Sequence, residues 1–287
     1  MWTKNGAKTL PFVLKRINEV IPREFVNIRV IADDQSEDNT VEIAQSFGWT
    51  VVLNEGTGIS DGANTALKHI ASEYFISFEQ DLLLAHDWWK KVPPLLENPR
   101  VAAASGMRFA DKPRGIRKLQ QYVAKKYRGE ANLSSWLRNR QKAAFTLGNT
   151  LDNTIYKTKI IRALGGFPKI KVNAGVDTTL AYRIQRAGYT WMVNYNVSSI
   201  HIRKGLRQEL SHQYWYGTQL HEIWGRIETE TNQRPPITKF DVLYRFFLSP
   251  FTGAFVALKT KEPTITLIHP LIRFYYLKGF LETGKGK

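Results

Sequence analysis

The stretch Val30-Ile31-Ala32-Asp33-Asp34-Gln35-Ser36-Glu37-Asp38-Asn39-Thr40 decides the fold of this chain. It begins as a buried β-strand would and passes directly into a group of carboxylates. In open α/β sheets, ligands bind beyond the carboxyl ends of the strands. The stretch therefore predicts a strand of such a sheet with a ligand site at its end.

A second strand-like run ends in acids further along the chain. Tyr74 to Phe78 runs directly into Glu79, Gln80 and Asp81. Two neighbouring strands that deliver carboxylates to the same sheet edge would converge on one pocket. Such a pocket could hold a hard cation together with a nucleotide.

Helical and strand-like segments alternate through the first part of the chain. Apolar residues between Thr9 and Ile21 recur at helical spacing, and Pro22 closes the run. Further helices are expected near residues 40–47, 60–70 and 88–96, and strands near 27–32, 50–53, 74–78 and 101–104. This alternation favours right-handed βαβ units. We therefore predict an α/β fold with a mainly parallel sheet flanked by helices.

Composition limits the chemistry and the partners. The 287 residues suffice for one large α/β domain with an appendage. They include no cysteine, so a disulfide framework, a thiolate metal site and a cysteine nucleophile are excluded. The formal charge of +16 predicts attraction to polyanions such as nucleic acid, anionic lipid headgroups or nucleotide-sugar phosphates.

Later segments are more basic and aromatic. Residues 107–142 interleave arginine and lysine with tyrosine and tryptophan, as long binding insertions do. From Phe240 to Phe280, short apolar runs broken by proline, glycine and arginine indicate amphipathic helices lying on a surface. No stretch approaches the ~20 apolar residues of a spanning helix, and the N-terminus lacks the apolar core of a signal peptide. We therefore expect a cytoplasmic protein without a membrane span.

Three motifs resemble those of the family 2 glycosyltransferases, which have the nucleotide-sugar-binding GT-A (Rossmann-like) fold. Ala32 to Ser36 is similar to the family's valine-aspartate-aspartate-glycine-serine turn, and Glu79 to Asp81 is similar to its aspartate-x-aspartate metal motif. Gly165 to Pro168, followed by Gly175 to Leu180, resembles the acceptor-side motif. The resemblance covers most of residues 1–205.

The resemblance also implies a domain organisation. Residues 1–205 would form the GT-A catalytic domain, with the basic insertion at about 107–142, and residues 206–287 would form a membrane-surface-associated helical segment. Family members normally open with an apolar strand before the segment that resembles Trp2 to Asn5, whereas here only Met1 precedes it. Either the first strand is very short, or the start codon lies downstream of the true one.

By the resemblance, Asp81 is the leading ligand of a divalent metal, Mn or Mg, that bridges protein carboxylates and the donor diphosphate. Glu79 stands where the family has its first aspartate and would act through water. His201 would complete the metal shell, and Arg203 would neutralise phosphate charge. The alternative for His201 is a structural role, which a lone histidine has more often.

The same resemblance assigns a nucleotide pocket. Asp34 would accept a hydrogen bond from the nucleobase, and Asp33 would orient the turn. The pocket would also be lined by Trp2, Thr3, Lys4, Asn5, Gly58 and Gln80. The structural alternatives are an Asx turn or helix cap, for which Asp38 and Asn39 are better candidates, and plain turn chemistry at the glycine.

Transfer with inversion needs a general base for the acceptor hydroxyl, unless the acceptor is already an anionic phosphate. Asp177 resembles the second acid of the family's glutamate-aspartate motif, with Val176 in the first position, and is assigned this role. Gly166 is expected on the phosphate or acceptor side. Asp177 could also be only the N-cap of the helix that follows it.

These features predict a metal-dependent inverting glycosyltransferase, a hexosyltransferase of the EC 2.4 class, that uses a UDP- or GDP-sugar in glycan biosynthesis. The basic and aromatic segments suggest peripheral association with the inner face of the cell membrane, and a polyprenyl phosphate or lipid-linked saccharide as acceptor. A basic nucleic-acid-binding protein would leave the acidic motifs unexplained, so no nucleic-acid partner is expected. A sugar nucleotidyltransferase and an inactive, membrane-associated relative remain alternatives.

Overall fold

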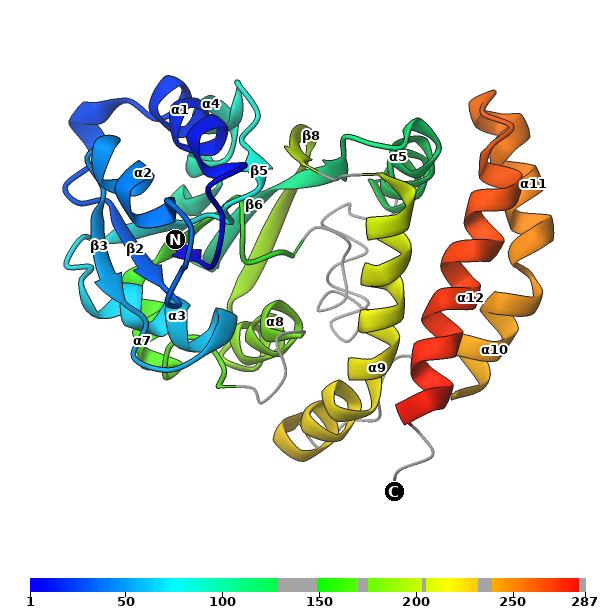
Figure 1. The fold of residues 1–287 in the computed structure, drawn as a ribbon. Coiled ribbons are helices and arrows are strands. Elements are labelled where there is room, and N and C mark those ends of the chain that lie inside the picture. The colour runs from blue at the N-terminus through cyan, green and yellow to red at the C-terminus, as the bar shows by residue number, and fades with distance from the viewer. Residues whose placement is uncertain (129–148, 170–174, 203–204, 232–238, 284–287) are drawn as a thin grey trace. The chain divides into compact units, whose positions relative to one another are not determined.

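The chain forms two compact units in a computed structural model that describes residues 1–128, 149–169, 175–202, 205–231 and 239–283 (Figure 1). Unit 1 comprises Met1–Arg108 and Ala131–Ile202, and unit 2 comprises Phe109–Glu130 and Arg203–Lys287. The first part of the basic insertion therefore belongs with the C-terminal helices. Arg203 and residues 129–142 of the insertion lie outside the described residues.

The first sheet of unit 1 is parallel and three-stranded. Its strands are β1 (Trp2–Thr3), β2 (Val30–Asp33) and β3 (Thr50–Leu53), in the order β1-β2-β3. The register pairs Trp2 with Ala32 and Thr3 with Asp33. This register places the end of the N-terminal segment beside the acidic turn that follows β2.

Helices connect these strands, as the alternating pattern predicted. They are α1 (Leu10–Val20), α2 (Thr40–Ser46) and α3 (Gly58–Lys68), with the 3-10 turn η1 (Arg23–Phe25) before β2. Pro11 lies in the first turn of α1. Backbone N–H groups in the first turn have no intrahelical acceptor, so a proline there removes no hydrogen bond. The apolar face of α1, including Leu10, Leu14 and Ile17, is buried in the core.

The second sheet of unit 1 has five strands in the order β4-β7-β6-β8-β5. These are β4 (Tyr74–Ser77), β7 (Thr154–Lys157), β6 (Val101–Ala110), β8 (Thr190–His201) and β5 (Leu82–Leu83). The pairs β4–β7, β6–β7 and β5–β8 are antiparallel. The predicted α/β class with a parallel sheet flanked by helices is confirmed, and the antiparallel pairs add a feature that the alternation of segments did not indicate.

Short helices complete unit 1, and an aromatic group fills part of its core. The helices are α4 (Trp88–Lys91), the 3-10 turn η2 (Pro93–Glu97), α7 (Thr158–Ala163) and α8 (Val176–Arg186). Tyr156 is fully buried, and its ring centroid lies 4.8 Å from that of Phe75 and 5.5 Å from that of Trp191. Aromatic contacts of this kind add to the stabilisation from apolar burial.

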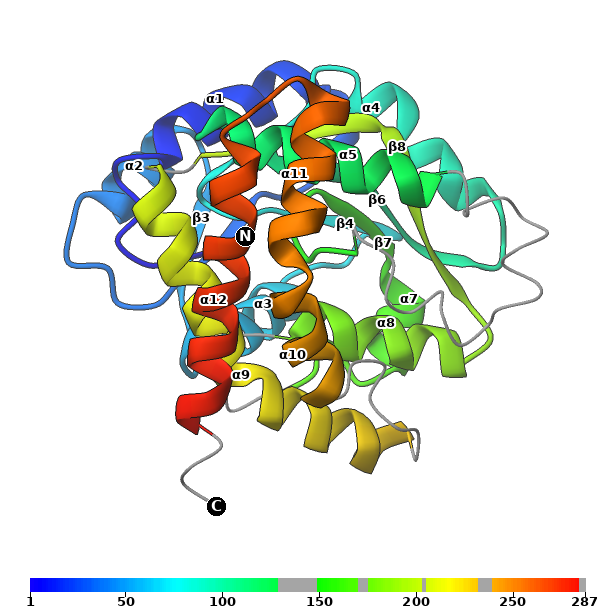
Figure 2. The ribbon, with the colours of Figure 1, turned by 90° about the vertical axis from the view of Figure 1, so that its right-hand side faces the viewer.

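Unit 2 is helical in its described residues, and Figure 2 shows α11 and α12 side by side. Its helices are α5 (Arg114–Arg128), α9 (Leu206–Thr231), α10 (Lys239–Phe247), α11 (Ser249–Thr260) and α12 (Ile265–Thr283). Ile116 and Leu119 of α5 belong to a buried cluster with residues of α11 and α12, such as Ile268. The prediction of helices between residues 240 and 280 is confirmed.

Two glycines let α9 and α12 approach closely. A Cβ atom at Gly217 would lie 2.1 Å from the carbonyl oxygen of Tyr276, and one at Gly279 would lie 2.1 Å from that of Tyr214. A side chain at either position would clash with the backbone of the other helix. The two helix backbones are therefore in contact at Gly217 and Gly279, which have no side chain.

Among the described residues, a single helix that is both long and apolar enough to cross a membrane is not found. The pair formed by α10 and α11, which meet at a bend of 57°, passes the same test of length and composition together.

Candidate active site

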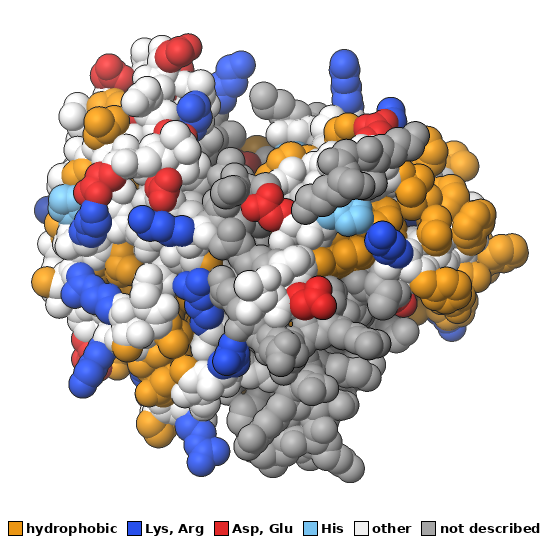
Figure 3. All heavy atoms as spheres, turned by 90° about the horizontal axis from the view of Figure 1, so that it is seen from below, with side chains coloured by type: hydrophobic (Ala, Val, Ile, Leu, Met, Phe, Trp, Pro, Cys, Tyr) orange, Lys and Arg blue, Asp and Glu red, His pale blue; other side chains and the backbone are white. Residues whose placement is uncertain are grey.

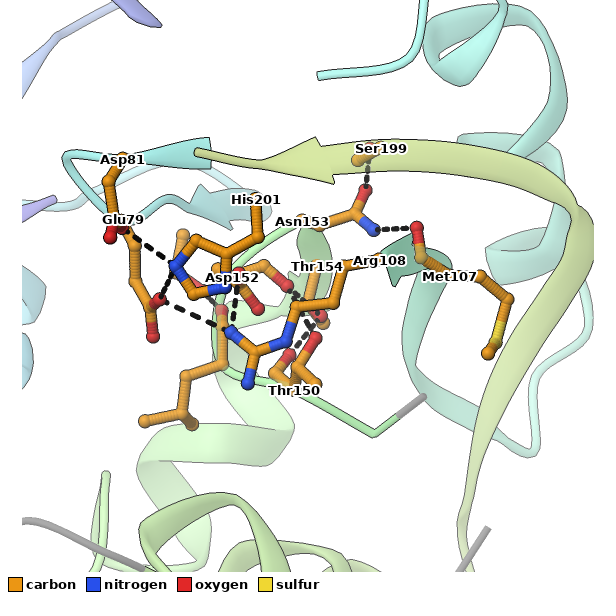
Figure 4. Close-up of polar contacts among 12 residues, drawn as sticks. Glu79, Asp81, Met107, Arg108, Thr150, Asp152, Asn153, Thr154, Ser199 and His201 are labelled. Carbon is orange, nitrogen blue, oxygen red and sulfur yellow. Dashed lines mark hydrogen bonds and ion pairs between the residues drawn. The ribbon is translucent and has the colours of Figure 1, made fainter. Parts of the chain in front are cut away.

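Three predicted metal ligands, Glu79, Asp81 and His201, meet where β5 pairs with β8 (Figure 4). The register pairs Leu82 with His201, and the amide of Ile202 donates to the carbonyl of Asp81 at 2.8 Å. Nε2 of His201 consequently lies 3.0 Å from Oδ1 of Asp81 and 3.7 Å from Oε2 of Glu79. The strand pairing thus assembles the three side chains that the sequence proposed separately.

The donor set of this cluster fits a divalent cation. One ligand atom from each of Glu79, Asp81 and His201 lies within 4.8 Å of the other two. Carboxylate oxygens suit Mg²⁺ and Mn²⁺, and an imidazole nitrogen suits softer first-row metals, so the mixed set suits Mn²⁺ well. The imidazole is buried, with 6% exposure, which fixes its ring beside the acids.

An arginine that the sequence analysis counted only among the charges of the basic insertion lies at this cluster. Arg108 is the one residue of β6 that is not fully buried. Its Nη1 atom donates to Oε2 of Glu79 at 3.2 Å and to Oδ2 of Asp152 at 2.9 Å. Arg108 therefore connects a predicted metal ligand to a second, deeper carboxylate (Figure 4).

Asp152 is a buried acid that the sequence analysis did not single out. It is 0% exposed, and its Oδ1 atom has no hydrogen-bond partner among the described residues. Burying an ionised carboxylate is costly unless a cation compensates it, and Arg108 supplies that charge. Arg108 therefore links the buried charge of Asp152 to Glu79, a predicted metal ligand.

The loop that carries Asp152 is held firmly to the sheet. Nδ2 of Asn153 donates to the carbonyl of Met107 at 3.2 Å, and Oδ1 of the same amide accepts from the Ser199 hydroxyl at 3.2 Å. Thr154 donates to the carbonyl of Thr150 at 2.6 Å. These bonds tie the loop to β6 and β8, so the position of the acid is fixed by the backbone around it.

Asp177 lies in the first turn of α8, and Gly175 with a φ of 83° caps the helix. The N-cap role considered for Asp177 therefore falls to the glycine. Oδ1 of Asp177 accepts from the amide of Thr178 at 2.7 Å. Burial raises the pKa of Asp177, while Arg108 acts in the opposite direction, so the carboxyl belongs to the same electrostatic group as Asp152.

The acidic turn after β2 contains one structural acid and one acid facing the N-terminal segment. Asp33 is buried and accepts from Oγ1 of Thr3 at 2.9 Å and from the amide of Ser36 at 2.8 Å, so it fixes the turn. Oδ2 of Asp34 lies 3.2 Å from the amide of Gly58 and 3.6 Å from Nζ of Lys4. Two further residues predicted for the nucleotide pocket, Lys4 and Gly58, thus lie beside Asp34.

Gln80 has a definite partner in the protein itself. The backbone amide of Lys4 donates to its Oε1 at 3.0 Å, and its Nε2 donates to the Lys4 carbonyl at 2.9 Å. The side chain proposed to contact the nucleotide therefore holds the N-terminal segment in place. Asn5 is bonded to the acidic turn after β2, because its backbone amide donates to Oγ of Ser36 at 2.9 Å.

Trp2 and Gly166 are placed against the core and against α3. Trp2 is half-buried and packs on the cluster that contains Tyr156. Gly166 has a φ of 78°, and the next residue, Phe167, exchanges two hydrogen bonds of 2.9 Å with the side chain of Asn64. A nucleotide contact of Trp2 and an acceptor contact of Gly166 stay predictions.

The structure thus has a mixed α/β fold with acidic residues at its strand ends, and a carboxylate-imidazole group that could hold a metal ion. The sequence profile of glycosyl transferase family 2 matches residues 1–165, and the chain belongs to this family. It is therefore a glycosyltransferase with the GT-A fold, and its Glu79, Asp81 and His201 group could hold a divalent metal ion. No curated protein matches the sequence.

Solved structures with a similar fold are glycosyltransferases. A mannosyltransferase from Pyrobaculum calidifontis, in complex with GDP-Man and Mn²⁺, has a TM-score of 0.66 and 20% identity over 100% of this chain and 86% of its own. Glucosyl-3-phosphoglycerate synthase from Mycobacterium tuberculosis has a TM-score of 0.54 and 15% identity over 82% of this chain and 79% of its own. TarS from S. aureus, in complex with UDP-GlcNAc, has a TM-score of 0.53 and 12% identity over 100% of this chain and 90% of its own.

Replacing Asp81 should weaken metal binding selectively. We expect Asp81→Asn to lower the affinity for Mn²⁺ by about tenfold or more, since it removes an anionic ligand from the cluster. Titration of Mn²⁺ followed by electron paramagnetic resonance measures the change. Asp87→Asn is the matched control, because Asp87 pairs with Lys91 on the surface. Equal Mn²⁺ affinity in both variants would show that Asp81 is not a ligand.

Removing the Arg108 guanidinium should destabilise the fold through Asp152. We expect Arg108→Met to lower the free energy of unfolding by about 3 kcal/mol or more, because a buried carboxylate loses its cation. The double variant Arg108→Met/Asp152→Asn should recover part of the loss. Arg114→Met is the control: Arg114 pairs with Glu262 at 3.0 Å but is 69% exposed, so a change within about 0.5 kcal/mol is expected. Urea unfolding of the wild type and the three variants measures these values, and a double variant no more stable than Arg108→Met would rule out the coupling.

Proposed function

We propose that this enzyme transfers a hexosyl group, with inversion, from a UDP- or GDP-sugar to a polyprenyl phosphate or lipid-linked saccharide at the inner face of the cell membrane. The observation that carries the transfer chemistry is the cluster of Glu79, Asp81 and His201 beside Arg108. The mannosyltransferase from Pyrobaculum calidifontis is in complex with GDP-Man and Mn²⁺, and the glucosyl-3-phosphoglycerate synthase is in complex with UDP and Mn²⁺. These complexes support both nucleotide classes as donors for this chain.

The nucleoside is proposed to lie at the ends of β1 and β2. Asp34 would accept a hydrogen bond from the base, and such a bond to a charged acceptor is short and strong. The ammonium of Lys4 lies 3.6 Å from the carboxylate of Asp34. The Lys4 side chain is 60% exposed, so it could also reach a phosphate. Gly58 supplies a backbone amide at the start of α3.

The departing diphosphate is proposed to lie against Glu79, Asp81 and His201. A bound divalent metal would supply Lewis-acid stabilisation of the diphosphate charge that develops as the glycosidic bond breaks. The protein's own contribution is to hold Glu79 and Asp81, in the turn before β5, beside His201 at the end of β8. Arg108, which is 21% exposed on its side chain, orients Glu79 from beneath.

The acceptor is proposed to be activated by Asp177. Burial raises the pKa of this carboxyl, which makes its ionised form a stronger base than an ordinary aspartate. The bond from the Thr178 amide fixes the oxygen Oδ1 and leaves Oδ2 to take the proton. A polyprenyl phosphate acceptor brings its own anionic oxygen and would need this base less.

The membrane proposal rests on unit 2, where each of three helices carries an apolar stripe that is exposed to solvent. The aromatic face, as we call it, consists of Phe240, Leu243, Tyr244, Phe247, Phe251, Phe255, Leu258, Leu267, Leu271, Phe274 and Leu281. Within each helix these residues recur at the spacing of one helical side. Figure 3 shows hydrophobic side chains gathered over the part of the molecule formed by these helices.

The exposure and the nearby charges of the aromatic face favour a lipid surface. Phe251 is 75% exposed and Leu258 is 80% exposed, so these side chains would lose most of their water contact on entering a bilayer interface. Lys259 lies 5.6 Å from the ring of Phe255, and Lys261 follows α11. Cations beside exposed aromatic side chains are typical of helices that lie on anionic membranes.

Donor binding and base catalysis can be tested separately. Calorimetric titration with UDP, GDP and their sugars should show binding of one nucleotide class that requires Mn²⁺ and is lost in Asp34→Ala. With a hydroxyl acceptor, Asp177→Asn should keep this binding but lower kcat by about 10²–10⁴-fold. The acid limb of the wild-type kcat profile should lie above the ordinary carboxyl pKa of 3.8, because burial raises the pKa of Asp177 and the base works only when deprotonated. Unchanged turnover in Asp177→Asn with a hydroxyl acceptor would contradict the base role.

Membrane association can be tested with vesicles. The protein should float with vesicles that contain phosphatidylglycerol and much less with phosphatidylcholine alone. Phe251→Ser/Phe255→Ser should weaken vesicle binding by about tenfold or more, through lost apolar burial. The control is Phe12→Ser, since Phe12 is 63% exposed on α1 of unit 1. Equal flotation of both variants would contradict the proposal that the aromatic face binds the membrane. Oligomers that dissociate only in the Phe251→Ser/Phe255→Ser variant would identify the face as a protein interface instead.

A further inference from the structure

The oxygen of Glu79 that faces the imidazole of His201 also contacts a cation of the protein. Oε2 of Glu79 lies 3.7 Å from Nε2 of His201, and the same oxygen accepts from Nη1 of Arg108 at 3.2 Å (Figure 4). A divalent cation bound by this oxygen and the imidazole would therefore meet the guanidinium of Arg108. Two cations repel one another at such short range, so Arg108 and a metal ion compete for Oε2 of Glu79.

Arg108 has a second anionic partner, and its bond to that partner is the shorter one. Nη1 of Arg108 donates to Oδ2 of Asp152 at 2.9 Å. Asp152 is 0% exposed, and its Oδ1 atom has no hydrogen-bond partner among the described residues. A carboxylate accepts two parallel N–H bonds from one guanidinium, because its two oxygens match the planar fork of arginine. Oδ1 of Asp152 can therefore accept a further bond from Arg108.

The two acids that share Arg108 differ in how firmly they are held. Asp152 is fixed by the loop around it, which Asn153 bonds to β6 and β8. Glu79 lies in the turn before β5, and its side chain is 21% exposed. Water screens a buried ion pair less than a pair near the surface. Arg108 is therefore expected to keep Asp152 and to release Glu79 when a second cation binds.

We propose that Asp152 is a positioning residue for metal binding: it draws the guanidinium of Arg108 away from Oε2 of Glu79, so that this oxygen can bind a divalent cation. When the cation binds, Arg108 forms a second bond to Asp152 through Oδ1 and gives up its bond to Glu79. The charges of Arg108 and Asp152 then offset one another, and Glu79 offers its full negative charge to the metal. This inference rests on the metal-binding role in the proposed function, and it is independent of the sugar and the acceptor.

A purely structural role for the buried pair accounts for less of the geometry. Compensation of the buried charge of Asp152 requires only its own bond to Arg108. It does not require that the same nitrogen also contact Oε2 of Glu79, yet Nη1 makes both bonds. The shared nitrogen atom is what connects the buried acid to the metal group.

The first test measures the Mn²⁺ affinity of the full chain by electron paramagnetic resonance. Asp152→Asn keeps the size of the side chain but removes its charge, so Arg108 pairs more strongly with Glu79 and competes better with the metal. We expect the Mn²⁺ affinity to fall by about tenfold or more, as it does when other supports of metal ligands are lost. Arg108→Met/Asp152→Asn removes the competing cation as well, and should return the affinity to the wild-type range.

A second background separates this competition from the general effect of a nearby negative charge. In Glu79→Gln the contested oxygen no longer carries a charge. Asp152→Asn should therefore change the Mn²⁺ affinity by less than about twofold in that background, although Glu79→Gln itself weakens binding. A long-range effect of the Asp152 charge would instead lower the affinity by the same factor in both backgrounds.

Three results would overturn the role of Asp152. They are an unchanged Mn²⁺ affinity in Asp152→Asn, no recovery in Arg108→Met/Asp152→Asn, and an equal loss from Asp152→Asn with and without Glu79→Gln. Each of them, with Mn²⁺ bound by the wild type, would leave the proposed function intact. A wild-type protein that binds no Mn²⁺ would refute both the proposed function and this inference.

A measurement on the wild type keeps the proposal testable if the Asp152 variants do not fold. Nitrogen NMR of the arginine side chains observes the guanidinium of Arg108 directly, and Arg108→Lys identifies its signal. Saturation with Mg²⁺, which is diamagnetic, should shift this signal as the bond to Glu79 is replaced by a second bond to Asp152. A signal that stays in place at saturation would show that Arg108 keeps both of its bonds, and would overturn the proposal.

Discussion

The compensation of buried negative charge is the constraint on which the candidate site depends. Asp152 is completely buried. Burial raises the pKa of the partly buried Asp177, Arg108 acts in the opposite direction, and Asp152 raises that pKa further. Arg108 is the cation that offsets them, and it also holds Glu79. The same side chain therefore supports the interior of the sheet and one edge of the metal site. Few substitutions at this position could satisfy both demands, because lysine offers a single point charge in place of a planar fork.

The sequence predicted elements whose pattern is local. The helical spacing of α1, the strand that ends in Asp33 and the acidic run from Glu79 to Asp81 are visible because each depends on neighbours in the chain. The antiparallel second sheet depends on pairings between distant strands, such as β5 with β8, and no local pattern encodes them. The roles of Arg108 and Asp152 were missed for the same reason, since 44 positions separate the two partners. The two bonds from the Gln80 side chain to the backbone of Lys4 were missed for the same reason, and the contact of Gln80 with the nucleotide stays a prediction.

The two units solve different physical problems. Unit 1 concentrates polar and charged groups at the ends of its strands and surrounds them with a core built on α1, Trp88 and Tyr156. Unit 2 has its own small cores, including the one between α5, α11 and α12, yet leaves the aromatic face uncovered. A helical unit can present such a face stably because the glycines of α9 and α12 bring those two backbones into direct contact. The close contact between α9 and α12 therefore stabilises the helices that carry the aromatic face.

The amide clamp of Gln80 on Lys4 has a thermodynamic consequence. Gln80 stands between Glu79 and Asp81 in the chain, so the turn that carries the two acids is fastened to the segment beside Asp34. A cation that reshapes this turn must also shift the segment on which the nucleoside is proposed to rest. Binding of the two ligands is then linked, and linkage is reciprocal: the factor by which the metal raises nucleotide affinity equals the factor by which the nucleotide raises metal affinity. The neutral side chain of Gln80, through its two bonds to Lys4, would contribute to the size of that factor.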